Sequence, residues 1–216
     1  MNKETADAGV LKSAMISAAD AIIAAEPELT RIDSVIGDGD HGIGMKTGFS
    51  ALKKELLAGR YETPYDLFHA CGLCLVKSMG GSSGVLFGTL LIGGLDEIHG
   101  KDSLDSQGLC ALFSGGIEAV MRRGKAKPGD KTMVDALVPA RACMQEAASG
   151  GCSIEELFRA AEAGALNGVE ATKRMLPRLG RSKNFREQAL GWPDPGAISV
   201  SILFRGLADG IAAIAF

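Results

Sequence analysis

The stretch Arg31-Ile-Asp-Ser-Val-Ile-Gly-Asp-Gly-Asp-His-Gly-Ile-Gly-Met45 organises the rest of the chain. It holds the carboxylates of Asp33, Asp38 and Asp40, the imidazole of His41 and several glycines, and it directly precedes a segment with helical spacing. Carboxylates gathered on a glycine-rich turn repel one another and resist burial, so they favour a place where a cation neutralises them. The stretch therefore predicts a magnesium site close to the start of a helix.

The spacing of the three aspartates suits a shared ion. Asp38 and Asp40 lie two residues apart across a glycine and can face one point, to which Asp33 can return from the preceding turn. Three carboxylates and the roughly four negative charges of ATP would leave about seven negative charges, of which two Mg²⁺ ions offset about four. The charge count favours two ions over one, although a solvated acidic turn that only caps a helix has the same composition.

The run Gly37-Asp-Gly-Asp-His-Gly42 also matches two unrelated motifs in form. It spells GxGxxG, but that dinucleotide fingerprint presents bare backbone amides to pyrophosphate after a strand, and two aspartates would repel the ligand. An EF-hand loop does not fit either, because Gly42 and Phe49 stand where further ligands belong. Carboxylate-bound magnesium is the interpretation that remains.

Apolar residues with helical spacing continue on both sides of this stretch. One helix is expected from about Val10 to Pro27, and the others over Ile43 to Gly59, Pro64 to Met79, Val85 to Ile98, Asp105 to Arg123, Asp130 to Ala148, Ile154 to Met175 and Pro195 to the C-terminus. Thr63 and Ser153 have the spacing of capping boxes, and Asp130 and Asp194 are expected caps. No run alternates as a strand does, so the sequence predicts an all-α bundle of about eight helices, forming one domain over residues 1–216.

Composition excludes several functional classes. Of 216 residues, 46% are apolar and 23% charged, with a formal net charge of -3, which is typical of a soluble globular protein and gives no sign of a nucleic-acid binder. The apolar run from Val85 to Leu95 is too short and too rich in glycine to span a membrane, and the N-terminus lacks the pattern of a signal peptide. We therefore expect a cytoplasmic protein.

Two groups of reactive side chains are better explained as residues of the core or the surface than as parts of a functional site. His69 and His99 each lie in a helical segment away from the glycine motifs. Cys71 and Cys74 have CxxC spacing, but no second pair completes a zinc site and no strand precedes them as a redox fold requires. We expect free thiols at all five cysteines, the others being Cys110, Cys143 and Cys152.

Three further glycine-containing loops open helices. Gly80-Gly-Ser-Ser-Gly84 offers backbone amides, two hydroxyls and a helix dipole, which together suit a phosphate. Gly129-Asp-Lys-Thr-Met133 and Asp194-Pro-Gly196 begin two more helices, and all four starts would share one surface if the helices alternate up and down. Arg181, in the long irregular stretch from Pro177 to Pro195, can reach phosphate oxygens.

These motifs together resemble a known family. Asp33, the run Gly37–Gly42, Gly80–Gly84 with Leu86-Phe-Gly88, Pro128-Gly-Asp-Lys-Thr-Met133 and Asp194-Pro-Gly-Ala197 occur in order as in the nucleotide-binding L subunit of dihydroxyacetone kinase, also called the DhaL or Dak2 domain. The resemblance covers nearly the whole chain. It implies an antiparallel, up-and-down barrel of eight α-helices with ADP or ATP and two Mg²⁺ ions at one end.

The resemblance also implies roles for individual residues. Asp33, Asp38 and Asp40 would bind the magnesium ions, and His41 and Arg181 would act at the phosphates undergoing transfer, with His41 donating to phosphate or orienting an aspartate. The phosphates would contact His41, Gly42, Ile43, Gly44, Ser82 and Ser83, and the rest of the nucleotide would contact Gly124, Met133, Arg181, Asp194, Pro195 and Gly196.

The activity implied is phosphoryl transfer to a small ketose that a separate K-type kinase subunit holds. Two departures bear on the donor and the sugar, since bacterial L subunits commonly have asparagine where this chain has Gly44 and often Gly-His-Gln where it has Gly191-Trp-Pro193. The donor is ATP or a phosphotransferase-system protein that recharges a bound ADP, and the sugar is dihydroxyacetone or a longer one such as a tetrose. A stand-alone kinase of another small acceptor, an ATPase and a regulatory module that docks to a transcription factor stay open as alternatives, as does a homodimer.

Overall fold

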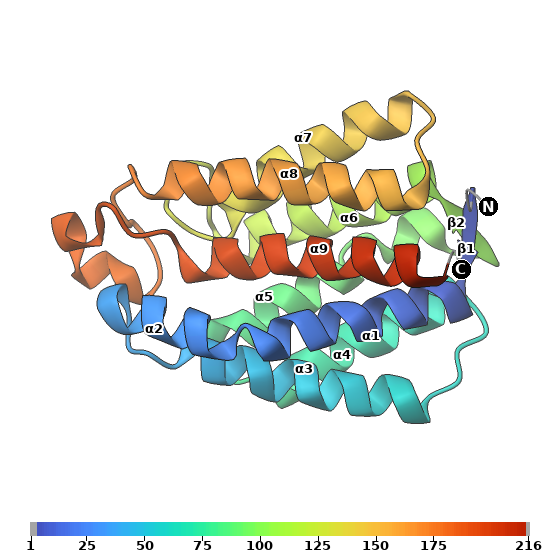
Figure 1. The fold of residues 1–216 in the computed structure, drawn as a ribbon, viewed down its shortest axis with the longest axis horizontal. Coiled ribbons are helices and arrows are strands. Elements are labelled where there is room, and N and C mark those ends of the chain that lie inside the picture. The colour runs from blue at the N-terminus through green and yellow to red at the C-terminus, as the bar shows by residue number, and fades with distance from the viewer. Residues whose placement is uncertain (1–3, 215–216) are drawn as a thin grey trace.

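The computed structural model describes residues 4–214 and shows them as a barrel of antiparallel helices (Figure 1). Within that range the α-helices are α1 (Ala8–Ala24), α2 (Glu26–Ile36), α3 (His41–Ala58), α4 (Pro64–Ser78), α5 (Gly81–Ile92), α6 (Ser106–Gly124), α7 (Val134–Ser149), α8 (Ile154–Thr172) and α9 (Pro195–Ile214). Short 3-10 helices follow at Leu95–Ile98 (η1), Arg181–Asn184 (η2) and Arg186–Ala189 (η3). The predicted all-α fold is confirmed.

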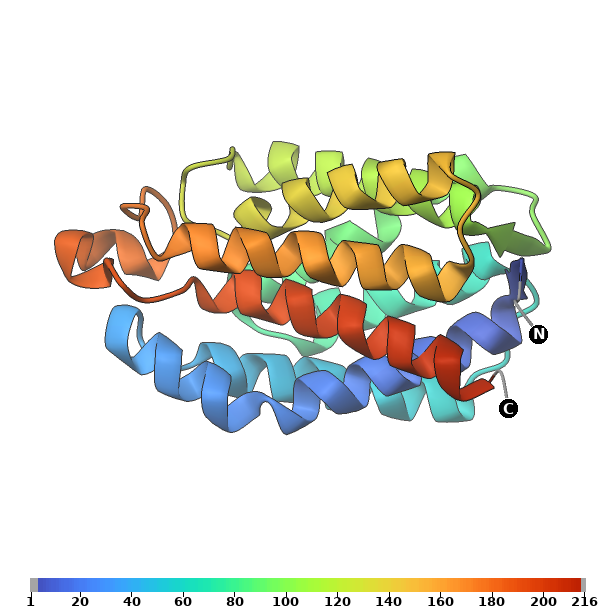
Figure 2. The same ribbon diagram turned by 45° about the horizontal axis from the view of Figure 1, so that its top comes forward.

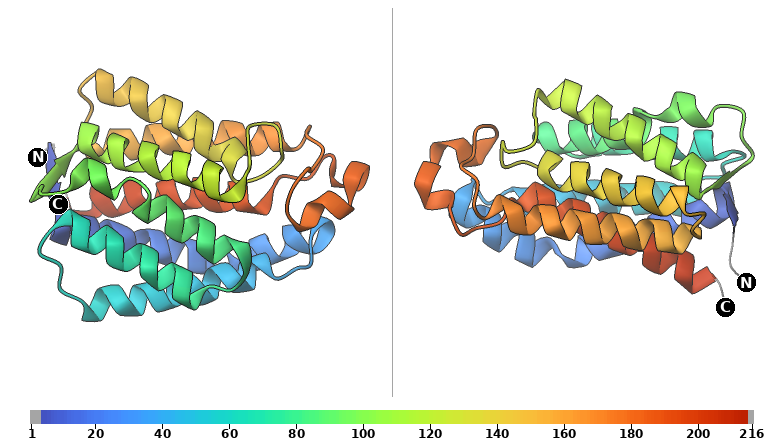
Figure 3. Two further views of the ribbon diagram at one scale, coloured as in Figure 1. Left: turned by 180° about the vertical axis from the view of Figure 1, so that it is seen from behind. Right: turned by 90° about the horizontal axis from the view of Figure 1, so that it is seen from above.

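Eight of the helices form a closed ring. Going round it, α1 packs against α9, and α9, α8, α7, α6, α5, α4 and α3 each pack against the next before α3 returns to α1 (Figures 2 and 3). The ring matches the predicted number of helices. The remaining helix, α2, continues α1 after a bend of 53° and packs against α3.

The sequence prediction for α2 was wrong. Pro27 was expected to end the first helix, whereas the structure places it in the first turn of α2. Proline is tolerated there because the backbone N–H groups of a first turn have no hydrogen-bond partner within the helix. Glu26 and Glu28 favour the same start through the helix dipole. As a result Asp33 lies in the last turn of a helix and not in a turn of the chain.

Several other boundaries differ from the prediction. The fourth predicted helix stops at Ile92, and the chain continues into η1 through Gly94, where α6 packs so closely that a side chain would collide with the Leu112 carbonyl. Asp130 does not cap α7, since its carboxylate accepts from the Lys127 amide within the preceding loop. Helix α8 ends at Thr172, before the predicted Met175.

A two-stranded ribbon, which the sequence did not predict, closes one end of the barrel. Strand β1 (Thr5–Asp7) pairs antiparallel with β2 (Ser103–Asp105), with Ala6 opposite Leu104. Helices α1, α4, α6 and α8 begin at this end, which we call the far end, and α9 ends there (Figure 1). Helices α3, α5, α7 and α9 begin at the opposite end, which we call the site end.

The core is apolar and centred on one aromatic side chain. Phe113 meets Phe68, Phe158 and Phe204 edge-on, with ring centroids 6.1, 5.9 and 5.4 Å away. Helix α9 has a mean hydropathy of 1.6 over its most apolar window, which would suit a membrane span, but 67% of that window is buried between neighbouring helices. Its composition is accounted for by its place in the core.

None of the cysteines, His69 or His99 lines the cavity described below. All five cysteines are free thiols, of which Cys71 and Cys110 are buried. Burial raises the pKa of the Cys71 thiol well above its ordinary value, which makes it a poor nucleophile. His69 and His99 both lie against the ring of Tyr65, which stands in the first turn of α4 at the far end.

Candidate functional site

A cavity of about 910 Å³ opens at the site end of the barrel. It is bordered by the first turns of α3, α5, α7 and α9, by the end of α6 and by the segment that joins α8 to α9. Its volume lies in the range of pockets that bind cofactors and small substrates. The predicted residues that line it are Asp33, Asp40, His41, Ile43, Gly44, Ser82, Ser83, Gly124, Met133, Arg181, Asp194, Pro195 and Gly196.

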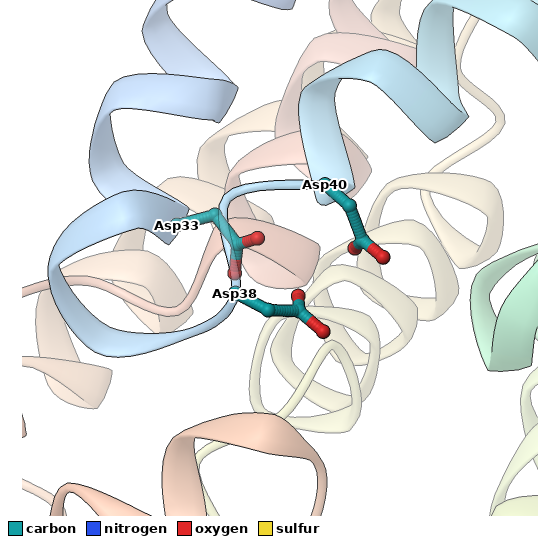
Figure 4. A group of neighbouring side chains, drawn as sticks. All are labelled: Asp33, Asp38 and Asp40. Atoms are coloured by element: carbon teal, nitrogen blue, oxygen red, sulfur yellow. The ribbon is translucent and has the colours of Figure 1, made fainter.

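Three carboxylates converge at one edge of this cavity. Asp33 comes from the end of α2, Asp38 from the following loop and Asp40 from the residue before α3, and one oxygen of each lies within 4.8 Å of the others (Figure 4). The Asp33 carboxylate also accepts a hydrogen bond from the His41 amide at 3.1 Å, which fixes its orientation. Three hard oxygen ligands that face one point suit Mg²⁺.

The charges of this cluster are costly without a cation. Burial, followed by the hydrogen bond and charge of Asp38 and the charge of Asp33, raises the pKa of Asp40, while Arg181 opposes the shift. The Arg181 Nε lies 3.0 Å from Asp38 Oδ2, and its side chain is 77% exposed. Asp38 lies at the edge of the cavity and pairs with Arg181. Because the Arg181 side chain is largely exposed to solvent, it can turn towards an anion.

His41 is held between two serines. Its Nε2 lies 2.8 Å from Ser199 Oγ in the first turn of α9, and its Nδ1 lies 3.4 Å from Ser83 Oγ at the start of α5. Because the Ser199 hydroxyl donates its proton to the Pro195 carbonyl, it accepts from a proton on Nε2. Burial lowers the pKa of His41, with Asp33 opposing the shift, so the ring is a neutral, oriented group.

The four helix starts are not equivalent. No side chain among residues 4–214 caps α5, so the amides of its first turn and the Ser82 hydroxyl remain available at the cavity, while the Ser83 hydroxyl contacts His41. Helix α3 likewise lacks a side-chain cap at Asp40. The backbone amides near the starts of α7 and α9 already donate hydrogen bonds to side chains of the protein.

The starts of α7 and α9 are tied by carboxylates of their own. Asp135 accepts from the amides of Gly129 and Thr132 at 2.5 and 2.8 Å. The predicted cap of α9 is present, since Asp194 accepts from the Ala197 amide at 2.8 Å. Burial raises the pKa of Asp194 to about 7, with the Ala197 amide and Lys131 opposing the shift. The start of α5 is therefore open to an anion, the starts of α7 and α9 are closed, and at α3 the first amide is taken by Asp33.

Two of the predicted residues, Asp38 and Gly42, do not line the cavity. Gly42 faces α2, where a side chain would collide with Thr30 and the Glu26 carbonyl, so glycine is required there for close helix packing. At Gly44 an added Cβ would meet no atom within 4 Å, so the packing does not require glycine.

Sequence reasoning missed several residues at the site. Leu86, Phe87, Val120 and Val134 add apolar side chains to the lining of the cavity, and the motif Leu86-Phe-Gly88 had given its residues no role. Ser199 and Lys131 depend on contacts with residues far along the chain, so no local pattern marks them. The motif Pro128-Gly-Asp-Lys-Thr-Met133 drew attention to the loop of Lys131 but gave that lysine no role.

Comparison with known proteins identifies the family. The family model described as the DAK2 domain matches residues 35–209. The chain belongs to the DAK2 domain family. A relative from Escherichia coli (strain K12), the ADP-binding subunit DhaL of a PEP-dependent dihydroxyacetone kinase, is 36% identical over 180 residues, which make up 83% of this chain and 86% of the relative.

Longer DAK2 relatives match as well. The D-erythrulose kinase of Mycolicibacterium smegmatis is 35% identical over 206 residues, covering 94% of this chain and 36% of that protein. The dihydroxyacetone kinase of C. freundii, solved with AMP-PNP and Mg²⁺, has a TM-score of 0.75 at 24% identity over 93% of this chain and 34% of that chain, which shows the shared fold. The chain thus belongs to a family of kinases and spans about a third of the length of these larger members.

Proposed function

We propose that this DAK2 domain is the nucleotide-binding, phosphoryl-transferring subunit of a two-component kinase of small hydroxyketones. The observation that supports it best is the meeting of three carboxylates with the uncapped start of α5 at one cavity. Carboxylates bind divalent cations and open helix starts bind anions, and a magnesium nucleotide needs both within a few ångströms.

In this proposal Asp33, Asp38 and Asp40 hold two Mg²⁺ ions, and the nucleotide is ADP or ATP. When bound, the ions would supply charge neutralisation for the phosphates. The buried carboxylate of Asp33 is held by the His41 amide, so it presents its remaining lone pairs in a fixed direction. The donor set therefore fits the ions that the proposal requires.

The chain itself would position the phosphates and neutralise their charge. The first-turn amides of α5, Ser82, Ser83 and the segment His41–Gly44 would contact the phosphates, and Arg181 would turn from Asp38 towards the group being transferred. His41 would orient the phosphates as a neutral donor or acceptor. Gly124, Met133, Asp194, Pro195 and Gly196 would line the remainder of the nucleotide pocket.

The acceptor is proposed to be dihydroxyacetone or a tetrose such as erythrulose, presented by a K-type subunit. The E. coli relative is named as an ADP-binding subunit of a PEP-dependent kinase, which favours a separate partner and a phosphotransferase-system donor. The M. smegmatis relative is named as an erythrulose kinase, which favours the longer sugar. We place the activity in the cytoplasm, with residues 1–216 acting as one nucleotide-binding domain.

The test mixes the purified chain with a K-type subunit, either sugar, and either Mg-ATP or a phosphotransferase-system donor with ADP. We expect a phosphorylated sugar in at least one combination, and none when Asp40→Asn replaces the wild-type chain. Nucleotide retained through purification would indicate a resident ADP, whereas an exchangeable site would indicate ATP. If no combination yields phosphorylated sugar, the proposed activity is wrong.

A further inference from the structure

Lys131 occupies an unusual place for a lysine. It lies in the loop before α7 in a left-handed backbone conformation with φ +57°, and none of its surface is exposed. Lysine is almost never fully buried, because removing an ammonium group from water is costly unless hydrogen bonds and opposite charges compensate. The contacts of Lys131 therefore show what offsets that cost.

The ammonium group connects two segments that are distant in sequence. Its Nζ donates to the Thr172 carbonyl at 2.5 Å, in the last turn of α8, and to the Trp192 carbonyl at 2.6 Å, shortly before α9. Carbonyls at a helix C-terminus lack partners within the helix and attract cations, so the first contact also satisfies the end of α8. Asp194 and Asp135 lie close enough to favour the charged form of the amine, which burial disfavours.

Further hydrogen bonds tie the same region together. The Asp194 amide donates to Thr172 Oγ1 at 3.0 Å, and the Gly191 amide donates to the Lys173 carbonyl at 2.8 Å. At the other side of the loop, the Arg178 amide donates to the carbonyl of Asp130, the residue before Lys131. The segment 173–194 is thus fastened near both of its ends, and Lys131 lies between the fastenings.

We propose that Lys131 is a positioning residue for the nucleotide, which it serves by holding the segment 173–194 against the barrel. Two groups of the proposed nucleotide site depend on this segment. Arg181 lies within it, and Asp194 to Gly196 follow directly after the Trp192 carbonyl that Lys131 holds. Lys131 borders the cavity, but its ammonium group is engaged by the two backbone carbonyls, so it acts through these groups. The inference rests on the proposed function for the identity of the ligand, but the anchoring itself does not.

The decisive variant is Lys131→Met, which keeps an unbranched side chain one atom shorter than lysine and removes the ammonium group. A left-handed backbone at φ +57° is as unfavourable for methionine as for lysine. The change therefore measures only the loss of the hydrogen bonds and of the charge. The matched control is Lys125→Met, since Lys125 has φ +50°, lies in the same connection between α6 and α7, and is exposed. Both proteins are studied well below their melting temperatures.

Two measurements separate anchoring from nucleotide binding. Hydrogen exchange followed by mass spectrometry, without nucleotide, should show at least tenfold faster exchange in peptides of segment 173–194 for Lys131→Met only. Calorimetry should show at least tenfold weaker binding of Mg-ADP for the same variant, with Lys125→Met like wild type. If the wild-type chain binds no Mg-ADP, the proposed function fails, while hydrogen exchange still tests the anchor.

A double-mutant cycle distinguishes positioning from a general loss of stability. If Lys131 acts by holding Arg181 in place, Lys131→Met and Arg181→Ala should weaken Mg-ADP binding together by less than the product of their separate effects. Independent effects, or wild-type exchange and affinity in folded Lys131→Met, would overturn the proposal. Should Lys131→Met fail to fold, Lys131→Gln replaces it, because its shorter amide cannot bridge both carbonyls and the same outcomes apply.

Discussion

The two ends of the barrel differ in how their helices begin. At the far end, all four helix starts carry a side-chain cap, from Asp7 at α1, Thr63 at α4, Asp105 at α6 and Ser153 at α8. Thr63 and Ser153 belong to complete capping boxes. At the site end, α3, α5 and α7 have no such cap, and α9 is capped by Asp194.

This difference separates stability from binding. A side-chain cap stabilises a helix by about 0.5–2 kcal/mol, so the far end gains from its four caps and the site end forgoes part of that gain. The amides left open at α5 can instead bind an anion through hydrogen bonds and the helix dipole. The helix starts at the far end are thus satisfied by side chains of the protein, whereas open backbone amides at the site end remain to bind a ligand.

The largest expected effect concerns the carboxylates of the site end. Asp40→Asn should weaken Mg-ADP binding at least a thousandfold, or about 4 kcal/mol, because it removes one metal ligand and one negative charge. The helical circular dichroism spectrum should be unchanged, since no helix depends on this carboxylate. Calorimetry checks the affinity, and Asp105→Asn at the far end serves as the control with wild-type affinity. An unchanged affinity in Asp40→Asn would remove the metal assignment.

The buried cap of α9 should give the site end its own pH dependence. The pKa of Asp194 is raised from 3.8 to about 7, so the folded chain holds this proton more tightly than the unfolded chain. This contribution to stability is fully present below pH 3.8 and is lost as the pH rises through about 7, and it amounts to at most about 4 kcal/mol.

Asp194→Asn tests this, because asparagine can still accept from the Ala197 amide but does not titrate. Urea unfolding of the nucleotide-free chain between pH 5 and pH 8 should show the variant gaining stability relative to wild type as the pH rises. A constant difference between the two proteins across this range would show that Asp194 does not titrate there.

Adding a cap to α5 would make the site end resemble the far end. Gly80 precedes α5 with φ -70° and ψ 166°, as capping residues do, and an added Cβ would meet no atom within 4 Å. Gly80→Asp should therefore stabilise the fold only slightly, by about 0.3 kcal/mol, because glycine is itself a tolerated capping residue. It should weaken Mg-ADP binding about tenfold, because the carboxylate occupies the open amides and repels phosphate.

Gly80→Ala is the control for that change, since alanine neither caps the helix nor carries a charge. Thermal unfolding measures the gain in stability, and calorimetry measures the affinity. Higher stability with unchanged affinity in Gly80→Asp would mean that the amides of α5 do not contact the nucleotide.

The smallest effect on Mg-ADP binding is expected for substitutions at the far end. Thr63→Ala removes the hydroxyl that accepts from the Asp66 amide and should lower the free energy of unfolding by about 1 kcal/mol. Mg-ADP affinity should stay at the wild-type value, because the change lies at the other end of the barrel. Ser153→Ala should behave in the same way, and a loss of affinity in either variant would show that the two ends are coupled.

Most of the barrel follows from local sequence signals. Helical spacing and the two capping boxes predicted the ring helices, and their up-and-down order brought the glycine loops to one end. Helix α2 was missed because a proline that starts a helix resembles one that stops it, and Pro27 stands directly after α1. The ribbon was missed because three residues in each strand are too few to show alternation.

Which residues form the site could be predicted better than the role that each of them has. The four glycine loops look alike in sequence, and the closed starts at α7 and α9 differ from the open start at α5 by the local contacts of Asp135 and Asp194. His41 stood out by its place beside Asp40, but its partner Ser199 lies 158 residues further along the chain. Such pairs depend on which helices become neighbours, which spacing alone does not specify.

The position of the chain ends has a practical consequence for anyone who labels this protein. Strand β1 and the last turn of α9 both lie at the far end (Figure 1), and a helix of 19 residues such as α8 measures roughly 28 Å at 1.5 Å per residue. A fluorophore or a surface tether attached to a side chain of β1 or of the last turn of α9 would therefore lie away from the cavity. Immobilised in this way, the barrel would present its nucleotide entrance to the solution.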